Sequence, residues 1–187
     1  YESAFCLHNK GIKVKAIIDI RESSNSKIVK KIVDAGIKIY WSYTVVDTTG
    51  YKKLNSISAM KLSNDGLSVT GNKINISCDC LGVAGGWTPA VHLFTQSGGK
   101  LVFDDNNKVF LPNKYPSDQL SVGSCNGDFS IKEIINNLST NLKQFLKIDQ
   151  TDFDHVKIES EEENSKRNIW LLPSDKPIGK TKPFVDF

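Results

Sequence analysis

A glycine-containing loop at residues 123–127 (GSCNG) has the residue types of a nucleotide-binding turn, because it directly precedes a helical pattern. Glycines let the backbone approach a pyrophosphate or ribose closely, and the first N–H groups of a helix can face an anion. A plain turn between a strand and a helix is the more common alternative for such a loop. The candidate ligand-binding residues are Gly123, Ser124, Asn126, Gly127, Asp128 and Phe129.

A second glycine turn, at residues 85–89 (GGWTP), supplies Gly85, Gly86 and Trp87 as further candidates. Trp87 could stack on a nucleotide or pack beneath a sheet, and the sequence does not separate these roles. Asp19 ends an apolar strand pattern, where an acid can bind a ribose hydroxyl. The alternative for Asp19, which we favour, is an exposed carboxylate beside Arg21.

Other reactive residue types form no recognisable site. Cys78 and Cys80 are too close for the usual Cys-x₂-Cys zinc motif, and no second pair follows. Alternate residues of a strand share a face, so we expect both thiols to pack in the core, and we expect Cys6 and Cys125 to be buried as well. His92 lacks a nucleophile or carboxylate at recognisable spacing, so a structural role is expected. We therefore predict no catalytic residue and no metal site in this chain.

The composition is typical of a globular protein and limits its partners. The chain has 187 residues, of which 39% are hydrophobic and 24% charged. Lys and Arg number 24 against 21 Asp and Glu, which argues against a strongly basic nucleic-acid binder. No apolar run approaches the roughly 20 residues of a membrane span, and no signal-peptide pattern opens the chain. With only four irregularly spaced cysteines, these features predict a reducing, cytoplasmic location.

Hydrophobic periodicity predicts the elements that position these residues. The expected elements are a helix at 2–9, a strand at 13–20, a helix at 27–35, strands at 37–46, 54–62, 73–77, 78–84 and 120–122, and a helix from residue 131 capped by Ser130. The opening alternation is typical of a doubly wound parallel sheet, and the strands at 54–62 and 73–77 indicate a β-meander.

This order resembles the second half of the two-dinucleotide fold of glutathione-reductase-like flavoproteins. The implied fold class is α/β: a partial Rossmann-like (FAD/NAD disulfide-reductase-like) fold with an inserted β-meander and a C-terminal helical connector. The first glycine-rich fingerprint of that fold would lie before Tyr1. The implied limits are 1–85 for the truncated second Rossmann-like unit with its meander, 86–127 for the return to the first dinucleotide-binding unit, 128–180 for the connector and 181–187 for the start of a linker to a folate-binding domain.

Three segments narrow the resemblance to the alpha subunit of heterotetrameric sarcosine oxidases. They are residues 84–100 (AGGWTPAVHLFTQSGGK), 126–129 (NGDF) and 182–187 (KPFVDF). The resemblance implies oxidative demethylation of sarcosine to glycine with formation of peroxide. It implies beta, gamma and delta subunits as partners, FAD and FMN held mainly through the beta subunit, and NAD bound to the alpha subunit. Tetrahydrofolate would accept the one-carbon unit through a C-terminal domain absent from this chain.

The resemblance implies that this part of the subunit is an NAD-binding surface and scaffold rather than the catalytic flavin site, and that the chain alone is inactive. The turn at 85–87 and the loop at 123–129 would line the NAD site, with Asp128 as its carboxylate. One alternative is a fragment of an NAD(P)H-dependent FAD oxidoreductase of the pyridine nucleotide-disulfide reductase class, although no Cys-x₄-Cys or Cys-x₂-Cys pair is present. Another is a protein-interaction module with a degenerate Rossmann core.

Overall fold

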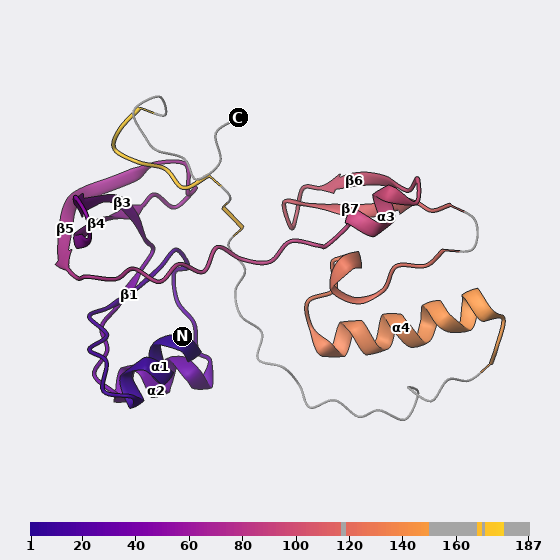
Figure 1. Ribbon diagram of the computed structural model, residues 1–187, viewed down its shortest axis with the longest axis horizontal. Coiled ribbons are helices and arrows are strands. Elements are labelled where there is room, and N and C mark those ends of the chain that lie inside the picture. The colour runs from indigo at the N-terminus through magenta and orange to yellow at the C-terminus, as the bar shows by residue number, and fades with distance from the viewer. Residues whose placement is uncertain (117–118, 150–167, 170, 178–187) are drawn as a thin grey trace. The chain divides into compact units, whose positions relative to one another are not determined.

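The computed structural model of the chain contains two compact units (Figure 1). The structure describes residues 1–116, 119–149, 168–169 and 171–177. Unit 1 consists of Tyr1–Val83 together with Glu163–Phe187, and unit 2 consists of Ala84–Glu162. The chain therefore leaves unit 1 once and returns to it. The finer limits at 85, 127 and 180 stay a prediction, and the segment at 181–187 lies outside the described residues.

Unit 1 begins with alternating helices and strands, as the hydrophobic pattern predicts. The elements are α1 (Glu2–Asn9), β1 (Ile17–Asp19), α2 (Lys27–Asp34) and β2 (Ile39–Trp41). β1 and β2 pair in parallel with Ile17 opposite Ile39, and α1 and α2 lie side by side (Figure 1). The mixture of helices and strands is thus confirmed, whereas a wider Rossmann-like sheet stays a prediction.

The β-meander of unit 1 is a three-stranded antiparallel sheet. It consists of β3 (Tyr43–Gly50), β4 (Leu54–Leu62) and β5 (Val69–Ser77), with β4 in the centre. The single strand expected at 37–46 is wrong, because Ser42 adopts a φ of 57°. Its N–H donates to the carbonyl of Arg21 at 2.8 Å, so the chain turns there and β2 and β3 belong to different sheets.

Unit 1 has two small groups of buried apolar residues, one on α2 and one on the central strand of the meander. Val29 and Ile32 lie three residues apart on α2 and therefore share a helical face; both are buried, and Ile32 is 0% exposed. The central strand of the meander is buried on both faces, since four of its apolar residues have little exposed area: Ile57, Ala59, Met60 and Leu62.

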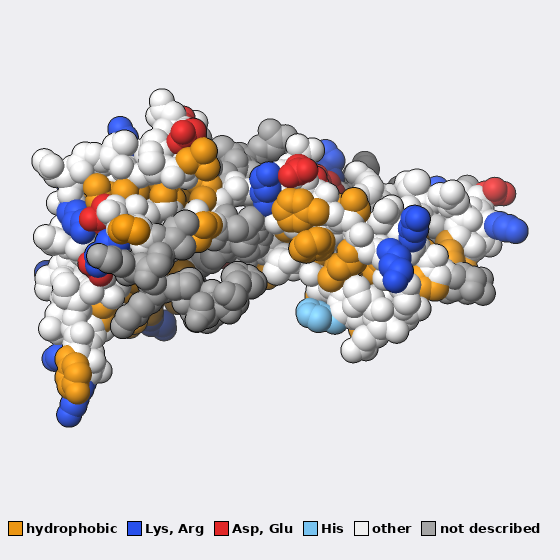
Figure 2. Space-filling model, turned by 90° about the horizontal axis from the view of Figure 1, so that it is seen from above, with side chains coloured by type: hydrophobic (Ala, Val, Ile, Leu, Met, Phe, Trp, Pro, Cys, Tyr) orange, Lys and Arg blue, Asp and Glu red, His pale blue; other side chains and the backbone are white. Residues whose placement is uncertain are grey.

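The described residues of unit 2 form a hairpin and three helical segments. They are α3 (His92–Gln96), β6 (Lys100–Asp104), β7 (Val109–Lys114), the 3₁₀ helix η1 (Gly123–Asn126) and α4 (Ile131–Leu146). Phe94 and Val109 are buried. Hydrophobic side chains also lie on the surface over the β6–β7 hairpin (Figure 2), where Phe103 and Phe110 are 44% and 55% exposed. In the described part of the chain, no helix is both long and apolar enough to cross a membrane.

Two predicted strands and two predicted burials are wrong. Residues 78–84 and 120–122 have no strand conformation, since neither segment pairs with another strand in the described part of the chain. Cys6 and Cys80 are exposed rather than buried, whereas Cys78 and Cys125 are half-buried. Cys80 loses its expected place in the core because the strand that was to carry it does not form.

We predict that Ile32→Ala destabilises unit 1 by about 2–5 kcal/mol, because it leaves a cavity beneath α2. The neighbouring Val33 is 60% exposed, so Val33→Ala should change the free energy of unfolding by no more than about 0.5 kcal/mol. Urea denaturation followed by circular dichroism measures both. Equal effects of the two substitutions would contradict the packing of α2 described above.

Candidate functional site

The loop at 123–129 lies where the sequence predicts it, directly before a helix. Gly123–Asn126 forms the turn η1, Gly127 follows with a φ of 89°, and α4 begins at Ile131. Ser130 caps that helix, since its Oγ accepts a hydrogen bond from the N–H of Glu133 at 3.4 Å. The predicted cap is thus confirmed, and the loop leads into the N-terminus of a 16-residue helix.

Asp128 carries an unsatisfied acceptor in this loop. Its Oδ1 accepts a hydrogen bond from Nδ2 of Asn137 at 2.8 Å, which fixes the carboxylate against α4. Its Oδ2 is buried and has no hydrogen-bond partner among the described residues. Because a buried acceptor without a donor is costly, this oxygen suits a ligand hydroxyl.

Asn126 is held by an aromatic residue that sequence reasoning missed. The hydroxyl of Tyr115 donates to Asn126 Oδ1 at 3.1 Å, and the Tyr115 ring packs edge-to-face against Phe94 with centroids 5.0 Å apart. Burial raises the pKa of Tyr115, so its hydroxyl stays protonated and remains a donor at neutral pH. No sequence pattern points to Tyr115, because its partner Asn126 lies 11 residues away along the chain.

Gly127 is required by packing within unit 2. A Cβ at this position would lie 2.5 Å from Cδ2 of Leu111 on β7, and the left-handed φ disfavours any other residue. Gly123 is buried and has a φ of 77°. Both glycines therefore shape the turn and seat it against its neighbours, whether or not a ligand approaches.

The turn at 85–87 lies apart from this loop. It has no regular secondary structure and is exposed, and Trp87 is 80% exposed. A Cβ added at Gly85 or Gly86 would meet no atom within 4 Å. Among the described residues, no hydrogen bond or ring contact joins 85–87 to 123–129. That the two segments line one site stays a prediction.

Asp19 lies at the carboxyl end of β1, where open α/β sheets bind ligands, but its carboxylate is already engaged. Arg21 donates through Nε and Nη2 to Asp19, the shortest contact being 2.7 Å, and the Tyr1 hydroxyl donates to Oδ2 at 2.5 Å. The Tyr1 ring stacks on Trp41 with centroids 6.2 Å apart. The partner predicted for Asp19 is confirmed, but its exposure is wrong, since Asp19 is only 8% exposed.

The electrostatics of this cluster keep Asp19 ionised. Burial alone would raise the pKa of Asp19, but the hydrogen bonds from Arg21 and Tyr1 outweigh burial and hold the pKa below its usual value. Burial and the bond to Asp19 raise the pKa of Tyr1, so its hydroxyl stays a donor. The cluster is a satisfied ion pair and offers no free acceptor to a ribose.

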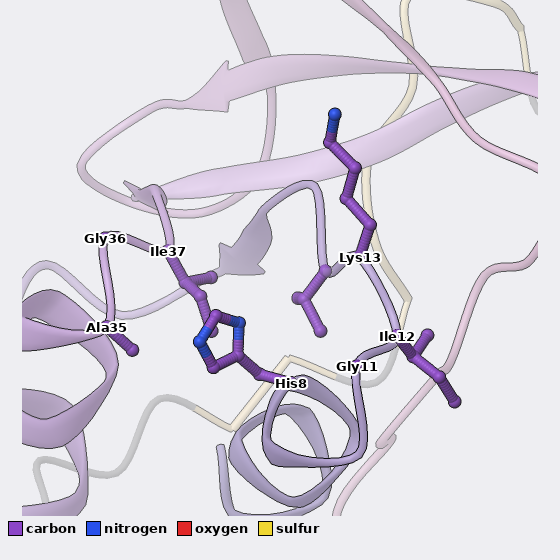
Figure 3. A pocket seen from close by; sticks show the side chains of 8 residues that line it. His8, Gly11, Ile12, Lys13, Ala35, Gly36 and Ile37 are labelled. Atoms are coloured by element: carbon purple, nitrogen blue, oxygen red, sulfur yellow. The ribbon is translucent and has the colours of Figure 1, made fainter.

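A hollow of about 240 Å³ lies at the opposite end of the parallel strands. It is lined by the ends of α1 and α2 and by the segments that precede β1 and β2, including His8, Lys13 and Gly36 (Figure 3). Lys13 extends away from His8 in this view. Because ligands of α/β sheets bind at the carboxyl ends of the strands, this hollow is at the wrong end for a nucleotide.

The remaining reactive residues that the structure describes are not brought together into a catalytic arrangement. His92 begins α3 and is exposed, and its structural role stays a prediction. No group of three or more His, Cys, Asp or Glu residues suited to a metal occurs in the described part of the chain. The arrangement can bind through hydrogen bonds at Asp128 and the N-terminus of α4, and it pairs no acid with a base.

Comparison with known proteins confirms the resemblance to sarcosine oxidase alpha subunits. Sarcosine oxidase subunit alpha of Corynebacterium sp. (strain P-1) is 29% identical over 184 residues, which cover 92% of this chain and 18% of that protein. Sarcosine oxidase subunit alpha of Corynebacterium sp. (strain U-96) is 26% identical over 114 residues, which cover 61% of this chain and 12% of that protein. The chain thus spans less than a fifth of the length of either relative.

Two other comparisons add no functional information. No protein-family model matches the chain. The crystal structure of L-proline dehydrogenase from P. horikoshii covers 78% of this chain and 29% of its own, with a TM-score of 0.45 and 17% identity.

We predict that Arg21 makes unit 1 more stable at neutral than at acidic pH. Since the pKa of Asp19 is lowered on folding, its contribution is present above its usual pKa of about 3.9 and is lost as the pH falls through the folded value. Arg21→Met should cost about 1–3 kcal/mol at pH 7 and flatten the decline of stability below about pH 4.

Urea midpoints measured from about pH 2 to 7 test this expectation. Arg21→Lys is the matched control, because it keeps the charge but loses the forked contact with the carboxylate. It should fall between the wild type and Arg21→Met. Parallel pH curves for the wild type and Arg21→Met would contradict the pairing.

We predict that Gly127→Ala loosens unit 2 by about 1–3 kcal/mol, because the new Cβ overlaps Leu111 and the backbone stays left-handed. Gly85→Ala is the control, since its Cβ meets open space. Hydrogen exchange of the β7 and α4 amides should accelerate in Gly127→Ala and stay unchanged in Gly85→Ala. Unchanged exchange in both variants would refute the contact with Leu111.

Proposed function

We propose that this chain is part of the alpha subunit of a sarcosine oxidase and contributes a nucleotide-binding surface and scaffold to it. The observation that carries the proposal is the similarity to two sarcosine oxidase alpha subunits, which in one relative extends over 92% of this chain.

NAD is the ligand that we propose for the loop at 123–129. Asp128 Oδ2 is the observation that fits it, since this buried oxygen lacks a donor among the described residues and a ribose has hydroxyl donors. The bond from Asn137 orients the carboxylate, and the N-terminus of α4 favours negative charge nearby. When bound, NAD is a carrier of hydride. Gly85, Gly86 and Trp87 are the proposed second segment of the site.

The wider assignments belong to the same proposal. The enzyme would demethylate sarcosine oxidatively, with oxygen as acceptor and FAD and FMN held mainly through the beta subunit. Beta, gamma and delta subunits would be its partners, and tetrahydrofolate would bind a C-terminal domain of the subunit. Residues 86–127 would return the chain to the first dinucleotide-binding unit. The few, irregularly spaced cysteines support a cytoplasmic location.

We predict that Asp128→Asn lowers the NAD affinity of the intact complex about 10-fold or more, because it replaces one of the two carboxyl oxygens by an amide nitrogen that donates rather than accepts. The change leaves an oxygen that can still accept from Asn137. Asp105→Asn is the matched control, since the Asp105 side chain is 84% exposed and lies in the turn between β6 and β7. Nucleotide released from the purified complex by acid and quantified by chromatography is the measurement.

Two outcomes would contradict the proposal. Full NAD occupancy in Asp128→Asn, with the affinity of the wild type, would reject the site. A wild-type complex that is active on sarcosine but contains no NAD would reject the nucleotide while leaving the subunit assignment intact.

A further inference from the structure

Two crossed ion pairs join distant segments of unit 1. Nζ of Lys73 on β5 lies 2.7 Å from Oδ2 of Asp175, and Nζ of Lys176 lies 2.6 Å from Oδ2 of Asp47 on β3. Adjacent residues of opposite charge thus reach the two outer strands of the meander. Lys176 and Asp47 are 129 positions apart in the chain, so the contact closes unit 1 after unit 2 has been inserted.

The strand register shows what lies between the two pairs. Asp47 is opposite Ser58 on β4, and Ser58 is opposite Asn75 on β5. Ser58 Oγ donates to Asn75 Oδ1 at 2.7 Å, so their side chains share one face of the sheet. Lys73 is two residues from Asn75 and therefore lies on that face as well. A segment that contacts both Asp47 and Lys73 must cross β4.

The burial of β4 agrees with such a crossing. Ser58 and Met60 are two residues apart and share this face, and they are only 7% and 8% exposed. Pro173 and Ser174, which precede the charged pair, are themselves half-buried. Figure 1 shows the returning segment, in yellow, beside β3 and β5. On this face the central-strand residues Ser58 and Met60 are thus shielded from water, whereas Asn75 on the outer strand is exposed.

We propose that residues 171–177 form a strap that is clasped across the meander by these two ion pairs and shields Met60 and Ser58. The strap fixes where the returning chain meets unit 1. Asp175 needs the cation of Lys73 on β5 and Lys176 needs the anion of Asp47 on β3, so a strap running from β3 towards β5 in the opposite direction would place like charges together. The four paired side chains are between 32% and 42% exposed, so salt screens the two ion pairs and can release the strap from the sheet. The strap is therefore a reversible closure of unit 1.

Charge reversal in the full chain tests the strap, with oxidation of Met60 as the readout. Met60 is the only methionine of the chain, so peptide mass spectrometry after dilute peroxide reports its sulfoxide unambiguously. For the first ion pair the variants are Lys73→Glu, Asp175→Lys and the double variant. For the second they are Asp47→Lys, Lys176→Glu and the double variant. Lys52→Glu is the control, because it makes the same charge change at an exposed position in the β3–β4 turn.

We expect each single reversal to speed Met60 oxidation about two- to five-fold in 0.1 M salt, and each charge-swapped double variant to return to the wild-type rate. In 1 M salt the screening length falls from about 10 to about 3 Å, so the Met60 oxidation rate of the wild type should approach that of the single variants. Lys52→Glu should oxidise at the wild-type rate.

Either of two results overturns the proposal. Single reversals that behave as Lys52→Glu would show that the strap does not shield Met60. Double variants in which the two single effects add, without rescue, would show that the charges do not act as pairs. Because the two ion pairs are tested separately, misfolding of one variant set leaves the other able to decide.

Discussion

A buried carboxylate with two side-chain donors organises the start of unit 1. Asp19 is 8% exposed, and a charge removed from water to that extent is tolerated only when it is paired and hydrogen-bonded. Arg21 and Tyr1 meet that requirement, and in doing so they fix their neighbours. The Tyr1 ring stacks on Trp41, and the carbonyl of Arg21 holds the turn at Ser42. The start of α1, the ends of β1 and β2 and the entry to the meander therefore depend on one ion pair.

The same ion pair explains why unit 1 offers no nucleotide site at its usual edge. A ribose would need the carboxylate of Asp19, but Arg21 and Tyr1 already use both of its oxygens. Releasing that carboxylate would leave a guanidinium without its partner in a half-buried place. The nucleotide site that we propose lies in unit 2, where Asp128 has an oxygen that none of the described residues satisfies.

Sequence patterns were sufficient where an element finds its hydrogen-bond partners locally. Helices α1, α2 and α4 satisfy their own backbone, and β4 pairs with strands adjacent to it in the chain, so periodicity predicted all four. Residues 78–84 are as apolar as a strand, but an apolar run becomes a strand only beside a free edge. Sequence patterns also did not predict burial and contacts that arise only in the folded chain. Asp19 was expected to be exposed but is buried, and no pattern indicated the hydrogen bond from Tyr115 to Asn126.

Glycine identity alone is weak support for a binding site, as the candidates here show. At Gly127 the volume of a side chain is filled by Leu111 and the backbone is left-handed, so the fold explains the glycine without any ligand. Gly86 is explained by its φ of 116°. Gly85 has neither constraint, because its surroundings are open and its φ is not left-handed. Nothing in the described structure requires glycine at 85. Gly85 and Asp128, rather than the glycines of the turn, are therefore the residues whose chemistry the chain's own packing leaves unexplained.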